Sequence, residues 1–131
     1  MAKIKLPRLN RVYLVGRLTK DPEVKQTQSG KSVLNARMAS NHLYKDGQGN
    51  WQEEVTYIDV VAWQRLAELC GEYLKKGSAV LVEGRLRSRS WESEEGKPRS
   101  AVEVRADRVQ FLDKVSSDDK DVEYETVEEE E

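Results

Sequence analysis

Apolar and polar side chains alternate in five separate stretches of the first 112 residues, and this alternation predicts five β-strands. The strands are expected at residues 12–18, 33–40, 55–63, 79–91 and 102–111. The third stretch is dense in β-branched and aromatic residues, which suit a pleated and half-buried surface. In the fourth stretch, Gly84 leaves a position without a side chain, which indicates a bulge or bend.

One segment has a different period, and it predicts a helix between the third and fourth strands. Apolar side chains follow the i, i+3, i+4, i+7, i+8 spacing of an amphipathic helix at Leu66, Leu69, Cys70, Tyr73 and Leu74. Cys70 and Tyr73 are expected in the core, and Gly77 suits the exit from the helix. Three strands, a helix and two strands form the element order of the OB-fold, an all-β, five-stranded Greek-key barrel with oligonucleotide- and oligosaccharide-binding members.

Two polar segments are expected to connect these elements. Residues 21–31 contain the turn signals Asp21-Pro22 and Ser29-Gly30, which predict an irregular connection between the first two strands. Residues 45–50, KDGQGN, predict the tip of a hairpin between the second and third strands.

Charge divides the chain near Leu112. Residues 1–112 carry 20 Lys and Arg against 14 Asp and Glu, a balance of +6, whereas residues 113–131 carry 2 against 10, a balance of −8. The first part is predicted to be one basic domain, and the second an acidic tail that stays flexible because it has few apolar residues to bury. Such a tail can serve solubility, compete for the basic surface of the domain or dock a partner. Composition leaves these three roles open.

Several classes of function lack their sequence signals. His42 is the only histidine and Cys70 the only cysteine, which excludes a Cys/His zinc cluster and an internal disulfide. Neither a phosphate-binding glycine motif nor a catalytic grouping is present, so we expect no enzyme, metal or cofactor. Asp59 is interpreted as a strand-face partner of a nearby arginine, in preference to a metal ligand of a nuclease. The N-terminal segment is basic and lacks the apolar run of a secretory signal or membrane span, which favours a cytoplasmic protein.

Aromatic residues placed among basic ones are the main functional pattern. They are Tyr44 and Trp51 on either side of the hairpin tip, Tyr57 and Trp63 on one face of the third strand, and Trp91. Trp91 shares a strand face with Arg87 and Arg89, because alternate residues of a strand face the same way. It can cover a gap at a hairpin end, or it can offer a stacking platform beside phosphate-binding arginines. Single-stranded nucleic acid needs flat side chains for its bases and a cationic path for its backbone, which favours the platform.

Three stretches carry a resemblance to a known family. NRVYLVGRLTKDPEVKQTQSGKSV, YIDVVAWQRLAELCGEYLKKGSAVLVEGRLRSRSW and the following EVRAD resemble the bacterial single-stranded DNA-binding proteins, and the likeness runs from about Asn10 to Phe111. The resemblance implies an OB barrel that assembles as a homotetramer. It also implies that single-stranded DNA wraps around this assembly without sequence preference, on the nucleoid, during replication, recombination and repair.

The same resemblance assigns roles to individual residues. Base-stacking aromatic residues of that family occur where this chain has Tyr44, Tyr57, Trp63 and Trp91. Its basic DNA-contacting residues are matched by strand and face at Arg37, Lys45, Arg87 and Arg89, and more loosely at Arg11, Arg17 and Lys76. Tyrosine stands at positions 44 and 57 where well-known members have tryptophan, and Trp51 matches no stacking position.

The tail departs from the family pattern. Members of that family end in a hydrophobic tip with proline and phenylalanine that recruits replication and repair enzymes, whereas this chain ends in EEEE. Its prolines are Pro7, Pro22 and Pro98, and Phe111 is its single phenylalanine.

The aromatic and basic residues, together with the resemblance, make a DNA-coating protein the leading hypothesis. An OB-fold adaptor that acts through protein contacts, and a metal-dependent nuclease, are the alternatives.

Overall fold

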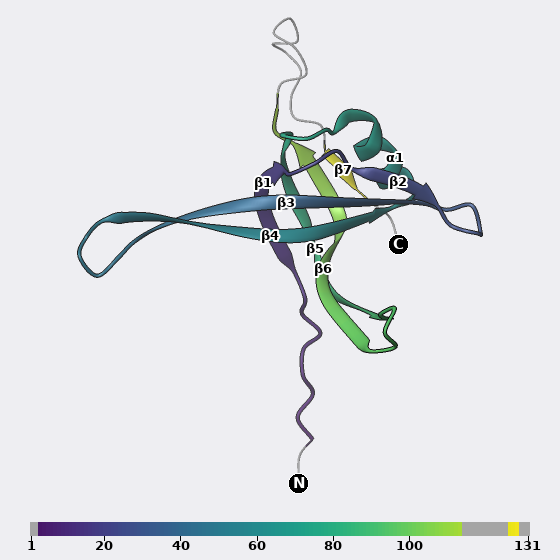
Figure 1. Ribbon diagram of the computed structural model, residues 1–131, viewed down its shortest axis with the longest axis horizontal. Coiled ribbons are helices and arrows are strands. Elements are labelled where there is room, and N and C mark those ends of the chain that lie inside the picture. The colour runs from purple at the N-terminus through teal and green to yellow at the C-terminus, as the bar shows by residue number, and fades with distance from the viewer. Residues whose placement is uncertain (1–2, 114–125, 129–131) are drawn as a thin grey trace, which may run out of the picture.

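The computed structural model describes residues 3–113 and 126–128, which form seven strands and one helix (Figure 1). The elements are β1 (Val12–Leu18), β2 (Glu23–Gln26), β3 (Ser32–Lys45), β4 (Trp51–Trp63), α1 (Gln64–Tyr73), β5 (Ala79–Glu92), β6 (Pro98–Phe111) and β7 (Thr126–Glu128). Within the described part of the chain, no helix is both long enough and apolar enough to pass through a membrane.

Five of the strands close into a barrel. Hydrogen bonds join them in the order β1-β5-β6-β4-β3, and β1 pairs with β3 at Arg17 and Leu18 to complete the circle. All of these pairs are antiparallel except β4 with β6, which run parallel at Val60 and Val104. The predicted five-stranded OB barrel, with its helix between the third and fourth barrel strands, is confirmed.

The barrel interior is filled by one face of each strand. Met38, Val80 and Val104 are fully buried there, and α1 contributes the buried Leu66 and Cys70. Removing these side chains from water is the main favourable term in folding, and α1 supplies the part of that apolar surface that the strands do not. The buried position predicted for Cys70 is confirmed. Tyr73 is half exposed, with its ring 6.0 Å from that of Phe111, so its expected core position was wrong.

Gly84 marks a change of register between β5 and β6. Glu83 pairs with Arg108 while Gly84 pairs with Ala106, so β6 carries one extra residue at Asp107. A Cβ atom on Gly84 would collide with the carbonyl of Arg105, which is why glycine is needed here. The predicted bulge is confirmed, and it changes the direction of the remainder of the β5–β6 hairpin.

One predicted connection contains a strand. Residues 21–31 were expected to be irregular, but β2 lies within them and pairs with β3 from Glu23–Asn35 to Gln26–Ser32. All four β2 residues are exposed, so the strand lacks the alternation that identifies a half-buried strand. Val24 of β2 rests on Gly71 of α1, where a larger side chain would collide with it.

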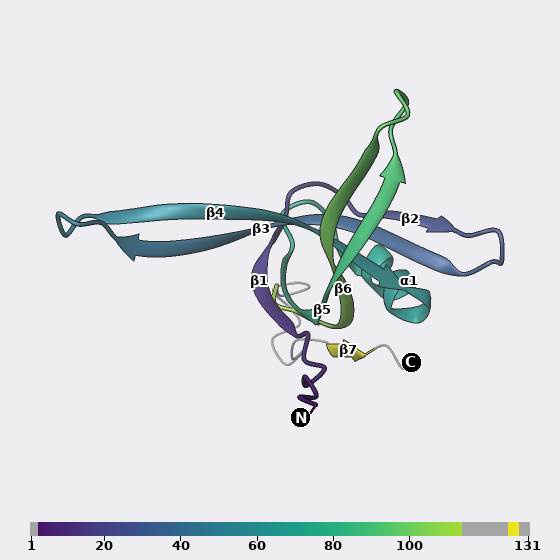
Figure 2. The ribbon, with the colours of Figure 1, turned by 90° about the horizontal axis from the view of Figure 1, so that it is seen from below.

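Two hairpins extend beyond the barrel as arms. The ends of β3 and β4 form a long arm on one side, and the ends of β5 and β6 form a second arm that leaves in a different direction (Figure 2). Both arms are longer than their apolar patterns predicted, because β4 begins at Trp51 and β6 begins at Pro98. Backbone pairing continues into these polar segments, where side-chain alternation gives no signal of a strand.

The acidic segment predicted as a flexible tail, residues 113–131, lies largely outside the described residues. Its described part includes β7, which pairs antiparallel with β6 over Arg108–Glu128, Val109–Val127 and Gln110–Thr126. This position is at the opposite end of β6 from the β5–β6 arm, whose strands begin to pair at Glu92 and Pro98.

Candidate nucleic-acid interface

The outer face of the β3–β4 pair gathers most of the residues that sequence reasoning selected on these strands. Residues paired across an antiparallel ladder share a face, and Met38 with Ile58 marks the inner one. The outer face therefore carries Arg37, Lys45, Trp51, Tyr57 and Trp63. Tyr44 pairs with Gln52 on the other face of the arm, where its ring stacks on that of His42 at 6.2 Å.

Tyr57 lies beneath an arginine held by a carboxylate. The Arg37 guanidinium carbon is 5.6 Å from the centre of the Tyr57 ring, and its Nη1 donates to Asp59 Oδ1 at 3.0 Å. Tyr57 is 55% exposed, so it remains accessible to solvent beside this arginine. The strand-face pairing expected for Asp59 is confirmed, and its partner is Arg37.

Trp91 has the same arrangement on the β5–β6 arm. The Arg89 guanidinium carbon lies 4.7 Å from the Trp91 ring centre, and Arg89 Nε lies 3.1 Å from Glu103 Oε1. Trp91 is 42% exposed, whereas Glu103 is only 5% exposed. These contacts favour the stacking-platform interpretation of Trp91 over one in which it covers a gap at the hairpin end, because the ring packs on a cation and is partly exposed.

A groove runs between these two sites. Its volume is about 290 Å³, and it is lined by Lys20, Glu23, Lys25, Asn35, Ala36, Arg37, Asp59, Arg89 and Glu103. We call it the central groove. The Arg37–Asp59 pair comes from β3 and β4, and the Arg89–Glu103 pair comes from β5 and β6. The two arginines that pack on Tyr57 and Trp91, from distant parts of the chain, thus line one groove.

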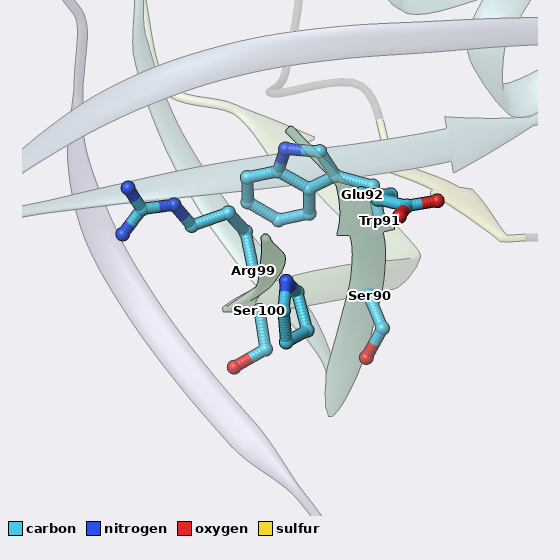
Figure 3. A pocket seen from close by; sticks show the side chains of 6 residues that line it. Ser90, Trp91, Glu92, Arg99 and Ser100 are labelled. Carbon is cyan, nitrogen blue, oxygen red and sulfur yellow. The ribbon is translucent and has the colours of Figure 1, made fainter. Parts of the chain in front are cut away.

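A second, more open cavity of about 490 Å³ lies on the β5–β6 arm (Figure 3). Trp91 and Arg99 are paired across the strands and project to the same side of the hairpin. Ser90 and Ser100 form the neighbouring pair and point the other way (Figure 3). Arg99 therefore places a second cation near Trp91, one that the sequence analysis did not select.

The tip of the β3–β4 arm presents a third ring and cation. The Lys45 ammonium lies 5.1 Å from the centre of the Trp51 ring, and Trp51 is 66% exposed. Asp46 closes the turn by accepting hydrogen bonds from the backbone N–H groups of Asn50 and Gln48, both at 2.9 Å. These donors, Asn50 first, lower the pKa of Asp46 because they stabilise its charged form. The predicted hairpin tip is confirmed.

The remaining predicted stacking residue, Trp63, is placed differently. It ends β4 directly before α1, is partly buried, and has its indole Nε1 buried without a hydrogen-bond partner among the described residues. It shares the outer face with Tyr57 but lies six residues further along β4, next to the helix. Less of its ring is open to a ligand than of the other predicted rings.

The predicted basic residues fall into two groups. Arg37 and Arg89 line the central groove, and Arg87 is exposed on the face of Arg89, with neither an ion pair nor a hydrogen bond to the described residues. Arg17 and Lys76 lie at the end of the barrel, where Arg17 Nη1 donates to the carbonyl of Gly77 at 2.8 Å. They do not line the groove.

Arg11 is also outside the groove, bound to acidic residues. Its guanidinium contacts Glu83 at 3.2 Å and Asp107 at 3.3 Å. A hydrogen bond with Tyr13 is the main cause that raises the pKa of Arg11, and the two carboxylates add to it. A phosphate would have to displace these partners.

Sequence reasoning missed several charged residues that line these two cavities. Lys20 lay just before the segment expected to be irregular, Glu23 and Lys25 fell within it, and Arg99 lay before the expected start of the last strand. Glu103 lay within that expected strand but had no identified partner. The strand register provides the missing signal for Glu103, since Glu103 stands opposite Arg87, and Arg89 lies two residues further along β5 on the same face. Among the side chains that the structure describes, no group of three or more His, Cys, Asp or Glu could hold a metal ion.

Comparison with known proteins gives consistent matches. The single-strand binding protein family matches residues 9–112. Single-stranded DNA-binding protein 2 of Chlorobaculum tepidum is 46% identical over 117 residues, covering 88% of this chain and 79% of that protein. The single-stranded DNA-binding protein of Oceanobacillus iheyensis is 47% identical over 105 residues, covering 80% of this chain and 64% of that protein.

Solved structures give the same result. A deletion mutant of the single-stranded DNA binding protein from Thermus aquaticus superposes with a TM-score of 0.72 at 37% identity, covering 80% of this chain and 51% of that one. The Plasmodium falciparum SSB in complex with ssDNA superposes with a TM-score of 0.77 at 26% identity, covering 84% of this chain and all of that one.

Proposed function

The chain belongs to the single-strand binding protein family, and from this we propose that it is a non-enzymatic protein that coats single-stranded DNA without sequence preference. The observation that carries the proposal is the pair of exposed rings, Tyr57 and Trp91, each packed against an arginine that lines the central groove. Every base has a flat face that can stack on such a ring, which is why binding of this kind tolerates any sequence.

The proposed contacts divide between bases and phosphates. Tyr57 and Trp91 stack bases in the groove region, Trp63 extends the path along the same face toward α1, and Tyr44 adds a base contact on the other face of the β3–β4 arm. Arg87 and Lys45, which have no ion-pair partner among the described residues, are the foremost phosphate contacts, and Arg37 and Arg89 add charge beside the rings. Arg11, Arg17 and Lys76 contribute more weakly because they lie away from the groove.

A titration with oligo(dT) tests this proposal. Stacking on Trp91 should quench tryptophan fluorescence, and contact with phosphates should make the affinity fall as salt rises. Folded protein that shows neither quenching nor a change in anisotropy of labelled oligo(dT) at low salt would exclude DNA coating. It would favour the adaptor alternative.

We also propose assembly as a homotetramer. The support is β1, which pairs with β5 along Val12–Arg17 but with β3 only at Arg17 and Leu18, so no described strand pairs with its other edge from Val12 to Gly16. Tyr13 and Val15 expose 64% and 53% of their surface on this strand. An open strand edge with apolar side chains is a template for pairing with another copy. Sedimentation equilibrium should give four times the 15.0 kDa of one chain, and a monomer would contradict the assembly.

The proposed biological setting is the cytoplasm, on the nucleoid, during replication, recombination and repair. In this setting residues 1–112 bind DNA and the acidic residues 113–131 compete for the same basic surface. A chain ending at Leu112 tests the division of labour, since it should bind oligo(dT) more tightly than the full chain at low salt. Equal affinities would leave solubility or docking as the role of the tail.

A further inference from the structure

We propose that Glu103 is a positioning residue for DNA binding: its buried carboxylate holds Arg89 against Trp91, so that ring and cation are in place before a base arrives. This inference rests on the proposed function. It assigns a role in binding to an acidic residue, which on charge alone would oppose a polyanion.

The burial of Glu103 is the first reason. It is 5% exposed, although it lies on the outward side of β6, since its neighbour Val104 fills the barrel core. Taking a carboxylate out of water is costly unless a charged hydrogen-bond partner compensates it. The described partner is Arg89, whose Nε lies 3.1 Å away, so Arg89 is held by an interaction that the carboxylate itself needs.

The geometry at the ring is the second reason. Arg89 and Trp91 lie on the same face of β5, and the guanidinium carbon is 4.7 Å from the ring centre. The guanidinium thus lies over the indole ring, and Trp91 still exposes 42% of its surface, which we propose receives the base. Arginine is long and loses side-chain conformational entropy when it is ordered. Because Glu103 already orders Arg89, this entropy is not lost again when DNA binds.

The charge of the central groove makes the role testable. Its lining has four basic residues, Lys20, Lys25, Arg37 and Arg89, against three acidic ones, Glu23, Asp59 and Glu103. If Glu103 acted only through its charge, neutralising it would attract phosphate more strongly and tighten binding. If it acts by positioning Arg89, the same change weakens binding. The two mechanisms predict opposite signs.

Asp59 and Arg37 repeat the arrangement in a weaker form. The Asp59 side chain is 45% exposed, against 6% for the Glu103 side chain, and Arg37 is 5.6 Å from the Tyr57 ring. An exposed ion pair is screened by water and holds its partners less firmly. Asp59→Asn should therefore change the affinity less than Glu103→Gln.

The experiment is a titration of full-length Glu103→Gln with labelled oligo(dT) at two salt concentrations, following anisotropy and tryptophan quenching. We expect binding about three- to ten-fold weaker than that of the native protein, with less quenching from Trp91. Unchanged or tighter binding overturns the inference. Native protein that fails to bind oligo(dT) at all would instead overturn the proposed function.

Two further variants distinguish the positioning of Arg89 from the effects of charge and of misfolding. Glu103→Asp keeps the charge but withdraws the carboxylate from Arg89, so it should also weaken binding, and native affinity would overturn the inference even where Glu103→Gln does not fold. Glu83→Gln is the matched control, since Glu83 pairs with Arg11 and Arg108 outside the groove. It should bind at least as tightly as the native protein.

A double-mutant cycle completes the test. In an Arg89→Ala background, Glu103→Gln should produce no further weakening, because the residue through which it acts is gone. An equal loss in both backgrounds would show a general structural effect and contradict the inference.

Discussion

The two arms of this protein carry similar residues but support them differently. On the β5–β6 arm, Trp91 packs on Arg89, and Arg89 is tied to the buried Glu103 near the barrel. On the β3–β4 arm, Trp51 packs on Lys45, which has no ion-pair partner among the described residues, at the tip of a ribbon with both faces exposed. From this difference we expect the Trp91 ring to be ordered before binding and the Trp51 ring to become ordered during it. An aromatic residue beside a cation should serve as a stacking platform when the fold holds both side chains in place.

The root of the β5–β6 arm should be the most sensitive point. Gly84→Ala places a Cβ against the Arg105 carbonyl, and forcing this contact should lower the free energy of unfolding by roughly 1–3 kcal/mol. Gly47→Ala, at the tip of the other arm, meets nothing within 4 Å and should change it by less than about 0.5 kcal/mol. Urea denaturation compares the two variants, and equal effects would contradict the bulge as the anchor of the arm.

Removing the anchored ring should have the largest effect on binding. Trp91→Ala should weaken oligo(dT) binding by roughly 1–3 kcal/mol, the range observed for a stacked base. Trp51→Ala should cost less than about 1 kcal/mol, because part of its stacking energy offsets the ordering of the tip. Anisotropy titrations of both variants at one salt concentration measure the difference. A larger loss of binding free energy from Trp51→Ala than from Trp91→Ala would contradict the proposed difference between the arms.

The basic residues should differ in their contribution to the salt dependence. Arg87→Ala should reduce the slope of log affinity against log salt by about 0.7, the value for one phosphate contact with a single strand. Arg17→Ala should leave the slope unchanged, since Arg17 donates to Gly77 and lies outside the groove. If Arg17→Ala lowered the slope as much as Arg87→Ala, the DNA path would have to reach the end of the barrel.

Substitutions of the aromatic residues in the arms should leave the stability of the barrel core unchanged. Burial raises the pKa of Cys70 to about 12, so its thiol stays protonated and shielded at neutral pH. Because the folded pKa is raised, ionisation of the thiol begins to destabilise the fold only as pH rises above the ordinary value of 9.0. We expect iodoacetamide to modify Cys70 slowly in the native protein, and at the same rate in Trp51→Ala and Trp91→Ala. Fast modification in either variant would show that the arms stabilise the core.

The barrel was predictable because its strands are half-buried. Buried residues such as Met38 and Val80 alternate with more exposed neighbours, and the single glycine in the fourth barrel strand, Gly84, marked the bulge. β2 was not predictable, because every residue in it is exposed and its pairing partner is supplied by β3. The outer ends of the arms were missed for the same reason.

The candidate site was predictable in its residue types but less so in their grouping. Tyr57, Trp91 and Arg89 were selected from position and strand face and Arg37 from the family resemblance, and each ring does lie beside its arginine. Tyr44 was selected too, yet it lies on the opposite face of the arm from Tyr57. Glu103 was missed, because only the register of β5 with β6 places it beside Arg89.

The most direct test of the central claim follows the three tryptophan indole N–H signals by NMR during a titration with oligo(dT). Trp51→Phe, Trp63→Phe and Trp91→Phe would assign the signals. Trp91 should shift most, Trp51 should shift less, and Trp63, whose Nε1 is buried, should shift least. Saturated binding that leaves the Trp91 signal in place would contradict the claim that bases stack on the ring anchored at the central groove.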